Sequence, residues 1–161
     1  MNATCNTLPG DARKKAVRLL NSTVADLFDL YARTKQAHWN LRGQSFFALH
    51  TLLDEFAGTI QQHIDVAAER ATALGGIVEG TLRDTVKRSR LKRKEEPASK
   101  SGQRDWIREL ADVHADCGDR IRSTIKKVSD EDDFATADLL TDALRDLDKQ
   151  LWILEAHIQR K

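Results

Sequence analysis

The chain has 161 residues, of which 32% are charged and 40% are hydrophobic, a size and composition that suit one folded domain. Eight Gly and two Pro are too few for the frequent turns of a β-sandwich or barrel. The formal net charge of +1 predicts no general attraction to nucleic acid or to an anionic membrane. Two Cys cannot form a disulfide scaffold, and no apolar run is long enough to span a membrane. We therefore expect a soluble helical protein of the cytoplasm.

Apolar residues recur in steps of three and four along most of the chain, which predicts four long amphipathic helices. Their apolar stripes cover residues 11–41, 46–74, 106–125 and 137–158. The long connection after the second helix makes a ferritin-like four-helix bundle the leading architecture.

Shorter signals mark the boundaries between these helices. Ser45 is the expected N-cap of the second helix, and Gly75-Gly76 is its expected end. A short amphipathic piece follows near Glu79–Arg88, and then a basic connector at about 87–103. Residues 1–10 form an uncharged tail, so that 11–161 make up the expected domain.

Histidine and carboxylate residues occur at helical spacing in and before the second helix. His50 and Asp54 are four residues apart, as are Asp65 and Glu69, so each pair shares one helix face. His38 lies near the end of the first helix, close to its apolar stripe. A mixed set of His and carboxylate ligands is typical of iron, zinc or manganese.

The separation of the two pairs restricts the kind of metal site that they can form. From His50 to Asp65 a helix rises roughly 22 Å, whereas a metal–ligand bond is about 2 Å. Either the pairs serve separate sites, or a two-fold axis brings one pair of a second subunit opposite the other pair. The Glu-x-x-His spacing of di-iron bundles is missing from the sequence, which disfavours a site inside one bundle. The simpler alternative is that both are ordinary surface pairs on an inert helical dimer.

Three segments resemble the Dps family, the mini-ferritins that protect DNA in starved bacteria. They are KQAHWNLRG at Lys35–Gly43, DVAAERATALGG from Asp65, and RDLDKQLWILEAHI near the end of the chain. The resemblance covers roughly residues 12–83 and 104–160. It implies an all-α ferritin-like bundle with a short extra helix between helices 2 and 3, and a hollow homo-dodecamer in the bacterial cytoplasm, associated with the nucleoid.

The resemblance also implies a ferroxidase, in which Fe(II) is oxidised by hydrogen peroxide in preference to dioxygen and ferric oxide is stored. Its ligands are shared across a two-fold interface and match His38, His50, Asp54, Asp65 and Glu69. The two acidic residues of the second pair are the firmest ligands, and both histidines come from the partner chain. Trp39 either quenches radicals or, as we favour, packs at the dimer contact. Zinc is an alternative occupant of the same ligands.

An acidic segment precedes the last helix, where negative charge stabilises the positive helix end. By resemblance, the start of this helix lines a three-fold pore that admits iron. Asp138 matches a pore acid, with Asp133 and Asp142 as further candidates.

DNA binding is the alternative main function, because many Dps proteins bind DNA through a Lys-rich tail. Residues 1–10 carry no charged side chain here, so the connector is the candidate surface. Its cations are Lys87, Arg88, Arg90, Lys92, Arg93 and Lys94. Repeated over an assembly, such cations would bind phosphate in a salt-dependent manner.

Overall fold

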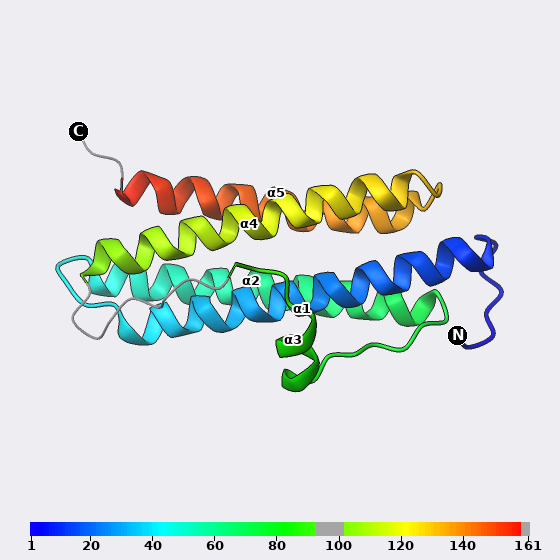
Figure 1. The fold of residues 1–161 in the computed structure, drawn as a ribbon. Helices are drawn as coiled ribbons and strands as arrows, with labels where there is room; N and C mark the ends of the chain where they lie inside the picture. The colour runs from blue at the N-terminus through cyan, green and yellow to red at the C-terminus, as the bar shows by residue number, and fades with distance from the viewer. Residues whose placement is uncertain (93–101, 159–161) are drawn as a thin grey trace.

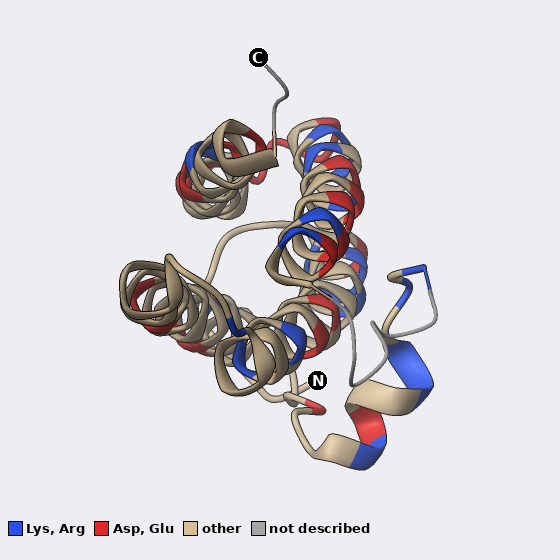
Figure 2. Ribbon diagram, turned by 90° about the vertical axis from the view of Figure 1, so that its left-hand side faces the viewer, with Lys and Arg blue, Asp and Glu red and all other residues tan. Residues whose placement is uncertain are grey.

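The computed structural model describes residues 1–92 and 102–158, which form five helices and no strand. The helices are α1 (Gly10–Asn40), α2 (Phe46–Ala73), α3 (Leu82–Arg88), α4 (Gln103–Ser129) and α5 (Phe134–Ile158). Figure 1 shows two antiparallel pairs, α1 with α2 and α4 with α5, which pack together as a bundle. The short α3 lies outside the bundle beside α1, as the end-on view in Figure 2 shows. The predicted all-α bundle with an extra helix is confirmed.

The predicted apolar stripes form the core. On α1 the side chains of Leu20, Val24 and Leu27 are fully buried, and α4 contributes Cys117 and Ile121 to the same cluster. A second cluster at the other end of the bundle includes large apolar side chains of α2, α4 and α5. Truncating one such Leu to Ala typically costs about 2–5 kcal/mol of unfolding free energy. In the described ranges, no helix is long and apolar enough to cross a membrane.

The second helix ends at the predicted glycines. Gly75 has a φ of +85°, and its N–H donates to the Thr72 carbonyl at 2.8 Å, while Gly76 N–H donates to the Ala71 carbonyl at 2.9 Å. These two bonds define a Schellman motif, which favours Gly at the left-handed position. A Cβ on Gly76 would lie 2.5 Å from a Val17 methyl carbon, so the second glycine is required for close packing against α1.

The predicted N-cap of α2 occupies the right position but forms no capping bond. Ser45 precedes Phe46, yet its side chain accepts no hydrogen bond from the first turn. Its φ and ψ of −92° and 19° lie outside the extended region that a capping residue normally adopts. A turn satisfies the helix start instead, in which Phe46 N–H donates to the Gly43 carbonyl at 3.1 Å.

The uncharged tail packs against the end of α2. Asn2 N–H donates to the Gly75 carbonyl at 2.6 Å, and Leu8 packs on the core. Arg13 joins the two segments, because its guanidinium donates to the Leu8 carbonyl at 3.1 Å and to the Leu74 carbonyl at 3.4 Å.

The described start of the basic connector is held by carboxylates of α1 and α4. The buried Asp26 accepts hydrogen bonds from the Arg90 backbone N–H at 2.7 Å and from its Nε at 3.0 Å. Asp116 accepts from the Lys92 backbone N–H at 2.8 Å. Arg93 and Lys94 lie outside the described residues.

Candidate metal centre

The two predicted histidine ligands lie together where α1 ends and α2 begins. His38 Nδ1 donates to the His50 carbonyl at 2.8 Å, and His50 Nδ1 donates to the His38 carbonyl at 3.0 Å. The rings stack with centroids 3.7 Å apart and an interplanar angle of 18°. Since a carbonyl only accepts, both Nδ1 atoms carry hydrogen, and in the neutral rings both Nε2 atoms keep a lone pair for a metal ion.

Asp54 lies on α2 one turn after His50, but in the isolated chain it contacts a lysine. Lys35 Nζ is 2.6 Å from an Asp54 carboxylate oxygen and 5.8 Å from the centroid of the Trp39 ring. The hydrogen bond and charge of Lys35 lower the pKa of Asp54, and the two histidines contribute in the same direction. Trp39 is 66% exposed, so its indole is available for contact with another molecule.

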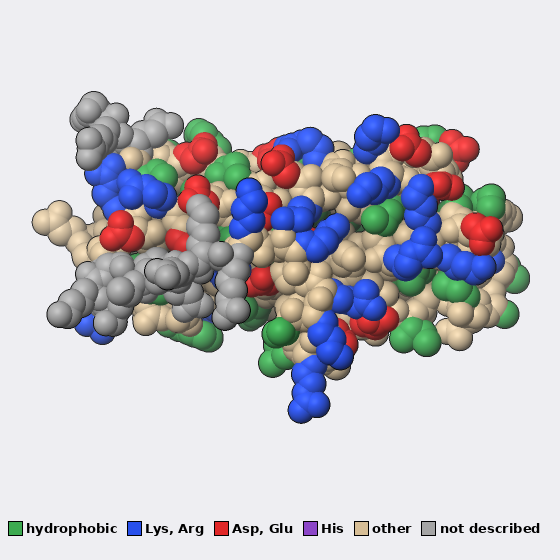
Figure 3. Space-filling model, viewed as in Figure 1, with side chains coloured by type: hydrophobic (Ala, Val, Ile, Leu, Met, Phe, Trp, Pro, Cys, Tyr) green, Lys and Arg blue, Asp and Glu red, His purple; other side chains and the backbone are tan. Residues whose placement is uncertain are grey.

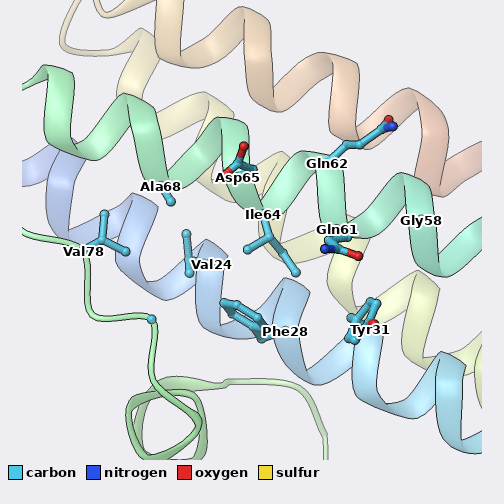
Figure 4. Close-up of a pocket in the computed structure, with 11 residues that line it drawn as sticks. Val24, Phe28, Tyr31, Gly58, Gln61, Gln62, Ile64, Asp65, Ala68 and Val78 are labelled. Carbon is cyan, nitrogen blue, oxygen red and sulfur yellow. The ribbon is translucent and has the colours of Figure 1, made fainter.

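The second carboxylate pair lies further along α2. Asp65 and Glu69 are exposed and form no ion pair among the described residues. Asp65 borders a groove of about 920 Å³ between α1 and α2. Figure 4 shows Phe28 and Tyr31 of α1 on one side of this groove and Ile64 of α2 on the other.

The structure keeps the two ligand pairs apart, as a single straight α2 requires. Both pairs lie on this helix, where His50 and Asp65 are separated by roughly 22 Å of helical rise. Within the described ranges, no three His, Cys, Asp or Glu residues of one chain come together as a metal site. The candidate ligands thus fall into two separate groups: His38, His50 and Asp54 at the junction of α1 and α2, and Asp65 with Glu69 further along α2.

The aspartates before and at the start of α5 lie in different environments. Asp133 is 2% exposed, and its carboxylate accepts from the Thr136 N–H at 3.1 Å and from Arg70 Nη2 at 2.7 Å. Asp133 thus caps α5 and is engaged within the chain, so that Asp138 and Asp142 are the exposed candidates at this end of α5. Asp138 is exposed on the first turns of α5, and the exposed Asp142 pairs with Arg145 at 2.6 Å.

The connector cations also differ in availability. Figure 3 shows Lys and Arg side chains along α1 and α4 and over α3, interspersed with acidic side chains. Lys87 and Lys92 are exposed. Arg88 forms an ion pair with Glu79, and Arg90 forms one with the buried Asp26. The guanidinium groups of these two arginines are therefore engaged within the chain.

Sequence reasoning missed the side chains that surround the predicted ligands. Lys35 precedes His38 by three residues, so helical spacing alone places it on the same face. Phe46 precedes His50 by four residues on α2, and the same helical spacing accounts for the contact of their rings, whose centroids are 5.0 Å apart. His63 and Arg70 of α2 bond to α5 and its cap, which required the arrangement of the helices to be known.

Comparisons with known proteins agree with this architecture. The family model for the ferritin-like domain matches residues 17–161. The chain is 40% identical over 158 residues to a DNA protection during starvation protein of Agrobacterium fabrum, covering 98% of this chain and 96% of that protein. The structure of DpsC from Streptomyces coelicolor superposes with a TM-score of 0.93 at 28% identity, covering 99% of this chain and 92% of that chain.

A third relative adds a chemical description. The Dps protein of Vibrio cholerae O1, described as a member of a broad superfamily of ferritin-like diiron-carboxylate proteins, has a TM-score of 0.87 at 25% identity. The alignment covers 99% of this chain and all of that one. Because the sequence identity and the shared fold extend along nearly the whole chain, the chain belongs to the Dps family of ferritin-like proteins.

Proposed function

We propose that this chain oxidises Fe(II) at centres completed by a second copy and stores the ferric product within a shell of twelve subunits. In each centre His38, His50 and Asp54 of one copy face the Asp65 and Glu69 carboxylates of another. The observation that carries the proposal is the separation of suitable ligands into two groups, one where α1 meets α2 and the other further along α2. Among the described residues neither group forms a metal site within one chain, and a two-fold axis would bring the two groups together.

The stacked histidines suit a pair of metal ions. Because Nδ1 of each ring donates to a backbone carbonyl, the Nε2 lone pairs of His38 and His50 are available for two metal ions. Asp65 and Glu69 of the second copy would supply negative charge. Near Asp54 a metal ion competes with the ammonium group of Lys35, which favours loose and reversible binding at that position.

From the resemblance to the Dps family, we propose hydrogen peroxide as the oxidant. Two Fe(II) ions each give up one electron, and one peroxide molecule takes both, so that its O–O bond breaks to give water. Because the two electrons are transferred together, no hydroxyl radical is released. The Fe(III) ions then hydrolyse, release protons and deposit as ferric oxide inside the shell.

Iron entry is assigned to the start of α5. Asp138 and Asp142 are exposed there, and three copies around an axis would concentrate cations. Since the charge of Asp142 is paired with Arg145, we expect Asp138 to contribute most of the attraction for iron. Asp138→Asn should slow iron uptake without changing the number of peroxide molecules consumed per iron. Equal uptake rates for the two proteins at low salt would argue against an electrostatic entrance.

The ferroxidase proposal is tested by Asp65→Ala combined with Glu69→Ala. Fe(II) is added anaerobically to the assembled protein, peroxide follows, and ferric absorbance is recorded. We expect rapid oxidation to be lost while the helical content is kept, because the ligands are exposed and outside the core. A control with Asp119→Ala and Glu155→Ala removes equal charge at exposed positions of α4 and α5 and should retain the rate. An unchanged initial rate in the ligand variant would refute the assignment.

DNA binding is a second candidate, suggested by the name of the Agrobacterium fabrum relative and by two exposed cations. Lys87 and Lys92 lie at the end of α3 and the start of the connector, and both side chains are exposed. In a shell of twelve copies these weak phosphate contacts would add. Zinc could occupy the His and carboxylate ligands in place of iron, because both metals accept this ligand set.

A further inference from the structure

The stretch of α2 that carries Asp65 and Glu69 is bonded to α5 through its opposite face. His63 and Arg70 are seven residues apart, which is about two helical turns, so they share a face. At about 100° per residue, this face points away from the one shared by Asp65 and Glu69. Two polar side chains therefore bracket the carboxylate pair along the helix and hold its far side.

Each of the two side chains forms a definite bond. His63 Nε2 donates to an Asp146 carboxylate oxygen of α5 at 2.8 Å, and only 8% of His63 is exposed. Arg70 Nη2 donates to Asp133 at 2.7 Å, and its Nε donates to Thr136 Oγ1 at 2.9 Å. Among the described residues, these are the side-chain hydrogen bonds that join α2 to α5 and its cap.

The Arg70 contact is part of a closed cluster. The Thr136 hydroxyl donates to Asp133 at 2.6 Å, and the Thr136 N–H donates to the other carboxylate oxygen at 3.1 Å. Asp133 and Thr136 are 2% and 0% exposed. A buried carboxylate that is left without its cation strongly destabilises the folded protein. The cluster therefore resists any shift of α2 relative to the start of α5.

We propose that His63 and Arg70 are positioning residues for the metal-binding carboxylates of α2. They fix the rotation and axial position of residues 65–69, so that Asp65 and Glu69 meet the histidines of a second copy in the required geometry. This proposal rests on the proposed ferroxidase function. Groups that orient metal ligands typically change metal affinity 10- to 100-fold when they are removed.

The test is Zn²⁺ binding by isothermal titration calorimetry on the assembled protein, since zinc reports on the ligands without oxidation. Arg70→Gln should raise the dissociation constant at least tenfold. Arg90→Gln is the matched control, because it also leaves a nearly fully buried carboxylate, Asp26, without its guanidinium. Thermal unfolding of the two variants should shift by similar amounts, whereas Arg90→Gln should keep the native zinc affinity.

A second pair of variants covers the case in which Arg70→Gln fails to assemble. His63→Leu removes the donor to Asp146 and should weaken zinc binding, whereas His63→Gln keeps an N–H donor and should restore most of the affinity. Native zinc affinity in both His63→Leu and Arg70→Gln would overturn the inference. Equal loss in Arg90→Gln would also overturn it, since the effect would then be general loosening. The proposed function itself would be refuted if the double variant Asp65→Ala with Glu69→Ala bound zinc with the affinity of the wild type.

Discussion

Hydrogen bonding separates two kinds of histidine in this chain. Among the described residues, His38 and His50 form hydrogen bonds through Nδ1 alone, so that Nε2 is left for a ligand. His114 uses both nitrogens, because Nδ1 donates to the Leu110 carbonyl at 2.7 Å and Nε2 contacts the Gln150 side-chain amide at 3.1 Å. Burial lowers the pKa of His114 below its ordinary value of 6.5, so this ring is held neutral in the core.

The neutral state of His114 predicts how stability depends on pH. The folded protein binds this proton less readily than the unfolded chain, so the stabilising contribution is complete above pH 6.5 and decreases as the pH falls below that value. The slope is at most about 1.4 kcal/mol per pH unit. His114→Gln should flatten the dependence of the urea unfolding midpoint between pH 7 and 5.

The exposed His157 provides the control for this measurement. His157→Gln should leave the pH dependence of the wild type in place. Parallel curves for the wild type and His114→Gln would show that a different group causes the acid sensitivity.

The same residue scale shows why part of the site could not be predicted. The ligand types and spacings on α2 are visible in the sequence, because a helix converts spacing into a shared face. The pairing of Lys35 with Asp54 and the capture of Asp133 by Arg70 depend on how separate helices are arranged. The sequence therefore did not indicate that Asp133 would be buried as the cap of α5.

At the scale of the helices, two glycines differ in whether the surrounding structure leaves room for a side chain. Gly118 lies inside α4, where an added Cβ would make ordinary contacts with Leu144 at 3.5 Å and Asp148 at 3.7 Å. Gly118→Ala should raise the free energy of unfolding by about 0.5–1 kcal/mol, because alanine loses less entropy in a helix. Gly76→Ala should lower it, since its Cβ would clash with Val17 and the Ala71 carbonyl. Urea denaturation measures both effects, and the same sign for both variants would contradict this interpretation.

The positions of the helices were largely predictable, because apolar residues at steps of three and four mark the face of each helix that is buried. The predicted end of α2 is correct, since only a left-handed residue completes its Schellman motif. Helix starts were less predictable, and α4 begins at Gln103, before the first residue of its apolar stripe, Trp106. A cap depends on local backbone angles, which is why Ser45 occupies the expected position without bonding to the helix.

At the scale of the whole molecule, large apolar side chains remain on the surface of the single chain. They include Phe47 at 80% exposed, Val86 at 84% and Trp152 at 65%. Burial of such groups in contacts between copies would favour assembly. We expect light scattering to give a mass near twelve times the 18.2 kDa of the chain. A stable monomer would contradict both the shell and the shared metal centre.

Any DNA binding should depend on the exposed connector cations. Lys87→Gln with Lys92→Gln should raise the protein concentration needed for a gel shift severalfold at low salt and should reduce the salt dependence. Arg108→Gln with Lys126→Gln removes equal charge from other exposed positions and serves as the control. Equal loss in both double variants would indicate attraction to overall charge. No shift with the wild type would leave chemical removal of iron and peroxide as the means of DNA protection.

The two cysteines have opposite surroundings, and this difference allows opening of the helix bundle to be measured on the unmodified chain. Cys5 is exposed, whereas Cys117 is fully buried in the core and burial strongly raises the pKa of its thiol. A maleimide should therefore alkylate Cys5 in the folded protein and reach Cys117 only when α4 separates from the bundle. The fraction of doubly alkylated chains, counted by intact mass spectrometry, would measure how often the core opens, without any substitution or added label site.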